Sequence, residues 1–293
     1  MIPYLLPCLY LLVPLVVCAL AIHWFERIIQ RRLSTRFGWS SVLWTGWLGT
    51  PIHESSHLLM CPVFRHRIDE VAFFEPDRKS GRLGYVRHSF HQGNWFEEMG
   101  NLFIGIAPLI GGSLVLLALL FVFYPDAANA AWMATAVPEN LPTIPVDGQA
   151  AAVSDALSSS NGIWEQLWLR TTGMLSSLLT LANWTGLRWW IFLYLVLCVG
   201  SHMAPSKSDY QGSLKGALIT AGIFIGLIAL LYAIQFDVKV FADLVLAVSA
   251  PLISILALAV ALCGISTSLI VALTSLIPMK TGPPASHSDR INR

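Results

Sequence analysis

The chain has 293 residues, of which 55% are hydrophobic and only 12% are charged, and its mean hydropathy is +0.64. Soluble domains carry about 25% charged residues, so this composition excludes an ordinary soluble protein and indicates a polytopic membrane protein. The formal net charge of +1, without a long basic run, predicts no nucleic-acid partner. The five cysteines form no C-x-x-C pair, which favours free thiols over a disulfide framework.

Six apolar segments follow one another along the chain, each near or above the ~20 residues that a membrane-spanning helix needs. They cover residues 3–25, 39–60, 101–124, 187–204, 216–234 and 244–277. The first resembles a secretory signal, but it lacks a basic start and its apolar run is too long, which favours a retained helix. We therefore expect an all-α polytopic membrane protein with about six transmembrane helices. A single membrane-embedded domain over residues 1–278 would be followed by a polar tail at 279–293.

The pattern changes from helical to strand-like after the second apolar segment. Residues 71–74 and 83–86 are β-prone and flank a polar turn at 75–81, which predicts a small β-hairpin in an insert at 64–91. His66 and His88 in this insert are expected to be interfacial or exposed. Residues 125–161 are rich in Ala, Ser, Pro and Asn, which predicts a flexible extramembrane loop. The Trp-rich, amphipathic residues 162–184 favour the membrane interface.

The most informative motif lies inside the second apolar segment and reads His53-Glu54-Ser55-Ser56-His57. The pattern H-E-x-x-H on a helix puts two imidazoles at i and i+4 on one face, where both can bind one zinc ion. Glu54 would then lie beside the metal, where it can act on a zinc-bound water. Unpaired polar groups in a membrane helix cost about 2–4 kcal/mol each, which disfavours an idle motif.

Zinc also needs a third protein ligand and one open position for water. The end of the fourth apolar segment offers the carboxylate of Asp209 and the imidazole of His202, with Pro205 and Gly212 breaking the helix there. We expect Asp209 to be the third ligand; the alternative is a helix-end carboxylate paired with a lysine. His202 is expected to support a ligand by hydrogen bonding or to contact substrate. Asn101, on the third segment, is expected to hydrogen-bond across helices, with substrate contact as the alternative.

These features resemble the site-2 protease family of intramembrane zinc metalloproteases. The resemblance rests on the intramembrane H-E-x-x-H helix, the hairpin after it and the distal helix break, and it covers residues 39–212. In that family the distal motif commonly reads N-x-x-P-x-x-x-x-D-G, and its Asp is the third zinc ligand. Here the segment reads His202-x-x-Pro205-x-x-x-Asp209, which is one residue shorter, with His in place of Asn and Tyr210 in place of Gly.

Intramembrane proteolysis is therefore the expected function, with a transmembrane protein as substrate and the lipid bilayer as its setting. Zn²⁺ would be held by His53, His57 and Asp209, and Glu54 would be the general base. One alternative is an inactive relative that binds membrane proteins without cutting them, but such a protein would not need Glu54. A metal transporter is a further alternative; it would need several intramembrane carboxylates or imidazoles along a path, and the sequence offers one cluster.

Positive charge sets an expectation for orientation. If six spans alternate, the basic hairpin, the lysines after the fourth segment and the basic tail share one side. This predicts a cytoplasmic C-terminus in a bacterial inner membrane. Arg27, Arg31, Arg32 and Arg36 would then fall on the opposite side, which conflicts with the rule. The alternative is that the segment with the zinc motif re-enters the membrane without crossing it.

Overall fold

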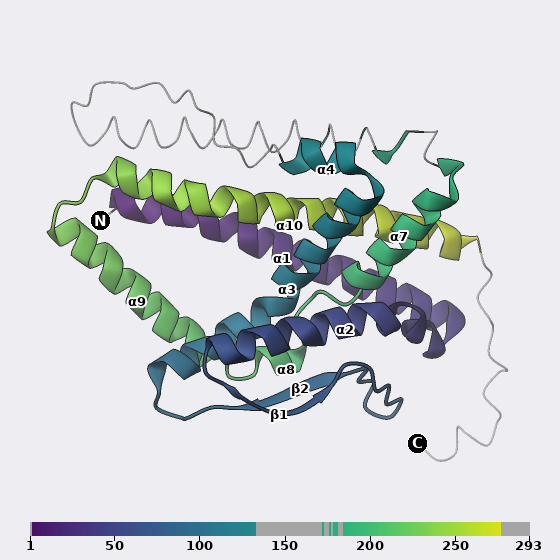
Figure 1. The fold of residues 1–293 in the computed structure, drawn as a ribbon, viewed down its shortest axis with the longest axis horizontal. Helices are drawn as coiled ribbons and strands as arrows, with labels where there is room; N and C mark the ends of the chain where they lie inside the picture. The colour runs from purple at the N-terminus through teal and green to yellow at the C-terminus, as the bar shows by residue number, and fades with distance from the viewer. Residues whose placement is uncertain (1, 133–171, 173–175, 177, 181–183, 277–293) are drawn as a thin grey trace, which may run out of the picture.

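A computed structural model describes residues 2–132, 172, 176, 178–180 and 184–276, and most of them are helical (Figure 1). The elements in chain order are α1 (Ile2–Phe37), α2 (Ser40–Val63), β1 (Arg67–Ala72), β2 (Tyr85–Ser89), α3 (Trp95–Phe123), α4 (Pro125–Trp132), α7 (Leu187–Gly200), α8 (Lys207–Tyr210), α9 (Ser213–Ala233) and α10 (Val238–Ser275). Four stretches are long and apolar enough to cross a membrane, namely Pro7–Phe37, Trp95–Phe123, Ser213–Ala233 and Leu252–Ser275. A mostly helical fold with four candidate membrane-spanning helices and a small hairpin is thereby confirmed, which is consistent with a helical membrane protein.

All six predicted apolar segments are helical, but two of them do not qualify as spans by length and hydropathy. Helix α7 has 14 residues, about 21 Å at 1.5 Å per residue, which is shorter than the hydrocarbon core of ~30 Å. Helix α2 is long enough at 24 residues but is not among the four apolar stretches. Its buried face carries small and polar side chains, including Thr45, Thr50 and Ser56, which lower its hydropathy. Six crossings therefore stay a prediction.

The predicted hairpin is present, but its strands lie further from the turn than the sequence indicated. β1 and β2 pair antiparallel, with Val71 opposite Val86, whereas residues 73–74 and 83–84 lie outside both strands. Polar pairs extend the ladder in the other direction, because Glu70 accepts hydrogen bonds from Tyr85 at 2.6 Å and from Arg87 at 2.7 Å. Cross-strand pairs of this kind stabilise a sheet without apolar side chains, and a search for β-prone residues overlooks them.

The predicted loop at 125–161 is wrong at its start. Residues Pro125–Trp132 form α4, because proline is favoured at the first position of a helix and Asp126 follows in the first turn. The remainder of that loop, the polar tail and most of the predicted interfacial segment at 162–184 lie outside the described residues.

Helices α1 and α10 lie side by side and run in the same direction (Figure 1). At their first ends the rings of Tyr4 and Phe241 are 5.5 Å apart, and further along Phe25 lies against the position of Gly264. Helix α3 crosses the centre of the molecule and packs against α2, α7, α9 and α10. These contacts make α3 the element that connects the α1–α10 pair to the hairpin side.

The main core lies where α3, α7 and α10 meet. Leu116 and Leu120 from α3, Trp189 and Phe192 from α7 and Leu262 from α10 are completely buried there. Lipid tails are as apolar as these side chains, so close packing rather than exclusion from water stabilises this core within a bilayer.

Helix α2 approaches the end of α7 and the segment after it closely at Gly49. A Cβ atom at Gly49 would lie 2.2 Å from the carbonyl oxygen of Cys198 and 2.7 Å from Nδ1 of His202. The hairpin approaches the same helix, since a Cβ atom at Gly46 would lie 2.7 Å from Cδ1 of Leu83. Glycine on α2 therefore lets two other segments reach the same helix.

We predict that Gly49→Ala lowers the unfolding temperature in detergent, because overpacking a close backbone contact costs about 1–3 kcal/mol. Gly226→Ala is the matched control: it is also a helical glycine, and nothing lies within 4 Å of its Cβ position. The control should be neutral or gain up to about 1 kcal/mol from helix propensity. Equal unfolding temperatures for the two variants would show that the approach at Gly49 is not tight.

Candidate metal centre

The two histidines of the motif lie on one face of α2 and point their Nε2 atoms at a common point. These atoms are 3.1 Å apart, as expected for residues separated by one helical turn. His57 is buried, and His53 is partly buried at the edge of a pocket. The predicted pairing of the two imidazoles is therefore present in the fold.

Two backbone carbonyls fix the orientation of these rings. Nδ1 of His53 lies 2.7 Å from the carbonyl oxygen of His202, and Nδ1 of His57 lies 2.8 Å from that of Ile104. A carbonyl oxygen can only accept, so each Nδ1 carries the proton and donates it. In the neutral rings both Nε2 atoms then present a lone pair. Metal-binding histidines are oriented by the same kind of hydrogen bond.

The carbonyl of Ile104 is free to accept because of a proline. A helical carbonyl normally accepts from the N–H four residues later, and here that residue is Pro108, inside α3. Proline has no N–H, so the carbonyl of Ile104 lacks its partner within the helix. His57 supplies the missing donor, which ties α2 to α3 at the site.

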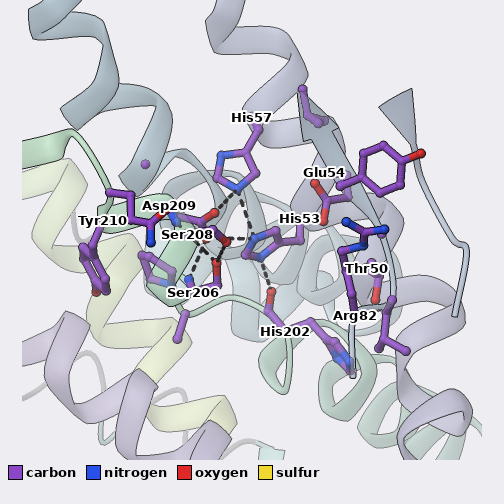
Figure 2. Close-up of a pocket in the computed structure, with 18 of the residues that line it drawn as sticks. Thr50, His53, Glu54, His57, Arg82, His202, Ser206, Ser208, Asp209 and Tyr210 are labelled. Atoms are coloured by element: carbon purple, nitrogen blue, oxygen red, sulfur yellow. Dashed lines mark hydrogen bonds and ion pairs between the residues drawn. The ribbon is translucent and has the colours of Figure 1, made fainter. Parts of the chain in front are cut away.

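Asp209 completes the cluster from α8, the short helix after the break (Figure 2). Its Oδ2 lies 3.4 Å from Nε2 of His53 and its Oδ1 lies 3.4 Å from Nε2 of His57. Ser206 holds the carboxylate in place, because its backbone N–H donates to Oδ2 at 2.6 Å.

The three groups fit a tetrahedral metal ion. Bonds of ~2.0–2.1 Å to a tetrahedral zinc place ligand atoms about 3.3 Å apart, and the three groups offer ligand atoms that all lie within 4.8 Å of one another. Two neutral imidazole lone pairs and a carboxylate repel one another unless a cation lies between them. Two His and one carboxylate also leave one position open, as in catalytic zinc sites.

Glu54 faces the same pocket from α2 (Figure 2). Among the described residues it forms no ion pair or hydrogen bond through its carboxylate, so this group is available to a molecule in the pocket. The pocket has a volume of about 970 Å³, and its lining comes from α1, α2, β2, α3 and the segment around Asp209. Arg82 of the hairpin also lines it, with its guanidinium 4.3 Å from the centre of the Tyr85 ring.

His202 and Asn101 both line the pocket and make the expected hydrogen bonds, to His53 and to another helix, but through their backbone carbonyls rather than their side chains. His202 supports His53 through its backbone carbonyl, while its ring lies close to Ser201 Oγ at 3.0 Å and to the Cys198 carbonyl at 3.2 Å. The amide of Asn101 donates within its own helix to Glu98. The backbone carbonyl of Asn101 accepts a hydrogen bond from Oγ of Ser213, on α9, at 3.1 Å.

His66 and His88 were expected to be interfacial or exposed; exposure is wrong for His66, which is buried, and His88 is partly buried. Their Nδ1 atoms are 2.8 Å apart, and Nε2 of His66 donates to the carbonyl of Glu97 at 2.7 Å. Burial, followed by the neighbouring His66, lowers the pKa of His88 to about 4. This pair fastens the hairpin to the start of α3.

Sequence reasoning missed two site residues on α1, Glu26 and Gln30, which line the pocket. The signal was available: they are an acidic and an amide side chain at i and i+4, on one face of a long apolar helix. It was overlooked because the predicted first span ended at residue 25.

We predict one zinc ion per chain by metal analysis of the purified protein. His53→Ala or His57→Ala should abolish stoichiometric zinc, and Asp209→Ala should weaken binding strongly, because each removes one of three ligands. His202→Ala is the matched control, since it removes an imidazole at the pocket but keeps the carbonyl that holds His53. Full zinc in Asp209→Ala together with loss in His202→Ala would overturn this ligand set.

No family model, curated protein or solved structure matches this chain. A functional conclusion therefore depends on the chemistry of the site itself.

Proposed function

We propose that this protein is an intramembrane zinc metalloprotease that hydrolyses peptide bonds in or near transmembrane segments of membrane proteins, similar to site-2 proteases. One observation carries the proposal: His53, His57 and Asp209 converge on one point, with Glu54 free beside them in a pocket among apolar helices. Mere metal binding does not require a free carboxylate next to the ligands. Hydrolysis does, because a water must lose its proton.

The residues of the site have distinct parts in this proposal. Bound zinc would lower the pKa of a water molecule toward ~7 and polarise the scissile carbonyl. Glu54 accepts the proton of that water and passes it to the leaving amine. His202 and Ile104 keep the two imidazoles in the tautomer that leaves Nε2 unprotonated.

We further propose that α2 re-enters the membrane from the pocket side rather than crossing it. The hairpin lies against α2 and carries exposed charges such as Arg78 and Lys79. Charged, open-edged sheets do not occur against lipid, which supports a water-filled setting for this face of α2. Arg27 of α1 lines the same pocket as Arg82 and Arg87 of the hairpin, so both basic regions belong to one side.

This arrangement removes the conflict over the arginines at the end of α1. With α2 re-entrant, the crossings among the described helices are α1, α3, the short α7, α9 and α10, and the end of α10 returns to the pocket side. The parallel course of α1 and α10 supports this order (Figure 1). The pocket side is the basic side, which makes it cytoplasmic by the positive-inside rule, in a bacterial inner membrane.

We predict that Glu54→Gln is folded and binds zinc but leaves a membrane substrate uncut. The amide keeps the shape of the side chain but cannot act as a base, and removal of a general base typically lowers the rate about 10²- to 10⁴-fold. Glu75→Gln, an exposed glutamate on the hairpin, is the matched control and should cut at the wild-type rate. Cleavage by Glu54→Gln at the wild-type rate would overturn the role of Glu54 as the general base. A wild-type protein that binds substrate and zinc but never cuts would favour the inactive binding protein.

The hairpin offers a means of holding substrate. A peptide bond inside a transmembrane helix must be unwound before it can react, and its freed N–H and C=O groups then need partners. An edge strand supplies such partners by β-addition. Of the two described strands, only β2 lines the pocket, so β2 is the strand that we propose pairs with the substrate.

Single prolines along Tyr85–Ser89 test this role, because each removes one backbone donor. We predict reduced cleavage at alternate positions, those whose N–H points away from β1, while zinc stays near one per chain. Prolines along Arg67–Ala72 are the matched controls, since they damage the same hairpin on the strand away from the pocket. Equal cleavage losses on both strands, or none on either, would mean that the hairpin does not present substrate.

A further inference from the structure

Two side chains of α1 hold the helix break that carries the third ligand. Nε2 of Gln30 donates to the carbonyl of Ser201 at 2.9 Å, and Oε2 of Glu26 accepts from the N–H of Ala204 at 2.8 Å. Glu26 and Gln30 are one helical turn apart, so both face the break from the same side of α1. The break therefore has two anchors, one on each side of His202.

The break needs these anchors because its backbone groups lack helical partners. Helix α7 ends at Gly200 and α8 begins at Lys207, and the residues between them form no continuous ladder. The carbonyl of Ser201 would normally accept from residue 205, but Pro205 has no N–H. Gln30 supplies that donor, and a side-chain oxygen of Glu26 gives the N–H of Ala204 an acceptor.

The same few residues also determine the geometry of the metal centre. The carbonyl of His202, between the two anchored groups, orients His53. Asp209 follows on α8, only five residues after Ala204. A shift of this break would move the carbonyl that orients His53 and the backbone that carries Asp209. The break thus connects α1 to two of the three ligands.

We propose that Glu26 and Gln30 are positioning residues of the metal centre, through which α1 fixes the placement of His53 and Asp209. This inference rests on the proposed metal site. This role explains why Glu26 lies on the pocket-facing side of α1. Its carboxyl group forms no ion pair with any described residue, and such a group costs free energy in an apolar helix. This role also makes the α1–α10 pair part of the catalytic framework rather than a separate membrane anchor.

The test is the zinc affinity of the full-length protein in detergent, measured by competition with a chelator. Glu26→Ala and Gln30→Ala should each weaken zinc binding about 10- to 100-fold, the range found for residues that orient metal ligands, while one zinc still binds at saturation. Glu26→Gln keeps an oxygen acceptor for Ala204 and should recover most of the affinity. Arg31→Ala, an exposed position one turn along α1, is the control and should bind like wild type.

The outcomes separate the two proposals. Wild-type affinity in both Glu26→Ala and Gln30→Ala would overturn the positioning role, and so would a Glu26→Gln variant as weak as Glu26→Ala. If Glu26→Ala does not fold, Gln30→Ala tests the same break from its other anchor. If the wild-type protein binds zinc but does not cut, only the proposed protease activity is overturned. If it binds no zinc, both that activity and the positioning role of Glu26 and Gln30 are overturned.

Discussion

The site depends on two hydrogen bonds from imidazole to backbone carbonyl. They decide which nitrogen of each histidine carries the proton, and so they decide that both Nε2 atoms face Asp209 with a lone pair. The bond from His57 requires α3 to approach α2 at Ile104, and the bond from His53 requires the break after α7 to reach the same helix. Glycine at position 49 permits that approach, because a larger residue would meet the backbone of Cys198.

Two prolines leave backbone carbonyls free to accept hydrogen bonds around the site. Within a membrane, a carbonyl without a partner is costly, so proline in a helix is tolerated where another group replaces the missing donor. Pro108 leaves the carbonyl of Ile104 to His57, and Pro205 leaves the carbonyl of Ser201 to Gln30. Each proline thus exchanges a bond within a helix for a bond between helices. The irregular backbone is the means by which the helices are connected at the site.

This explains how far the sequence alone could go. His53, Glu54 and His57 were predictable because their relation is local, one turn of one helix, and the hairpin turn was predictable from its Pro, Asp and Gly. Asp209 was expected near the histidines because it lies at a helix break and matches a family motif; no local pattern predicts the contact, since Asp209 lies 152 positions after His57. The contacts of Glu26 with Ala204 and of His57 with Ile104 were missed because one partner in each is a backbone group, and a backbone group has no letter in a sequence.

The low hydropathy of α2 also follows from the residues that it contributes to the site. One face of the helix carries the reactive groups and close-packed small residues, while Trp44, Trp47, Leu59 and Val63 are exposed on its surface. A hydropathy average mixes these faces, so a helix that borders a wet pocket scores below one that lipid surrounds. Hydrolysis needs water, and a bilayer excludes it. If the protein cleaves peptide bonds at membrane depth, as proposed, a segment that brings water to them must be less apolar than its neighbours, and α2, which carries two of the three proposed metal ligands, has this character.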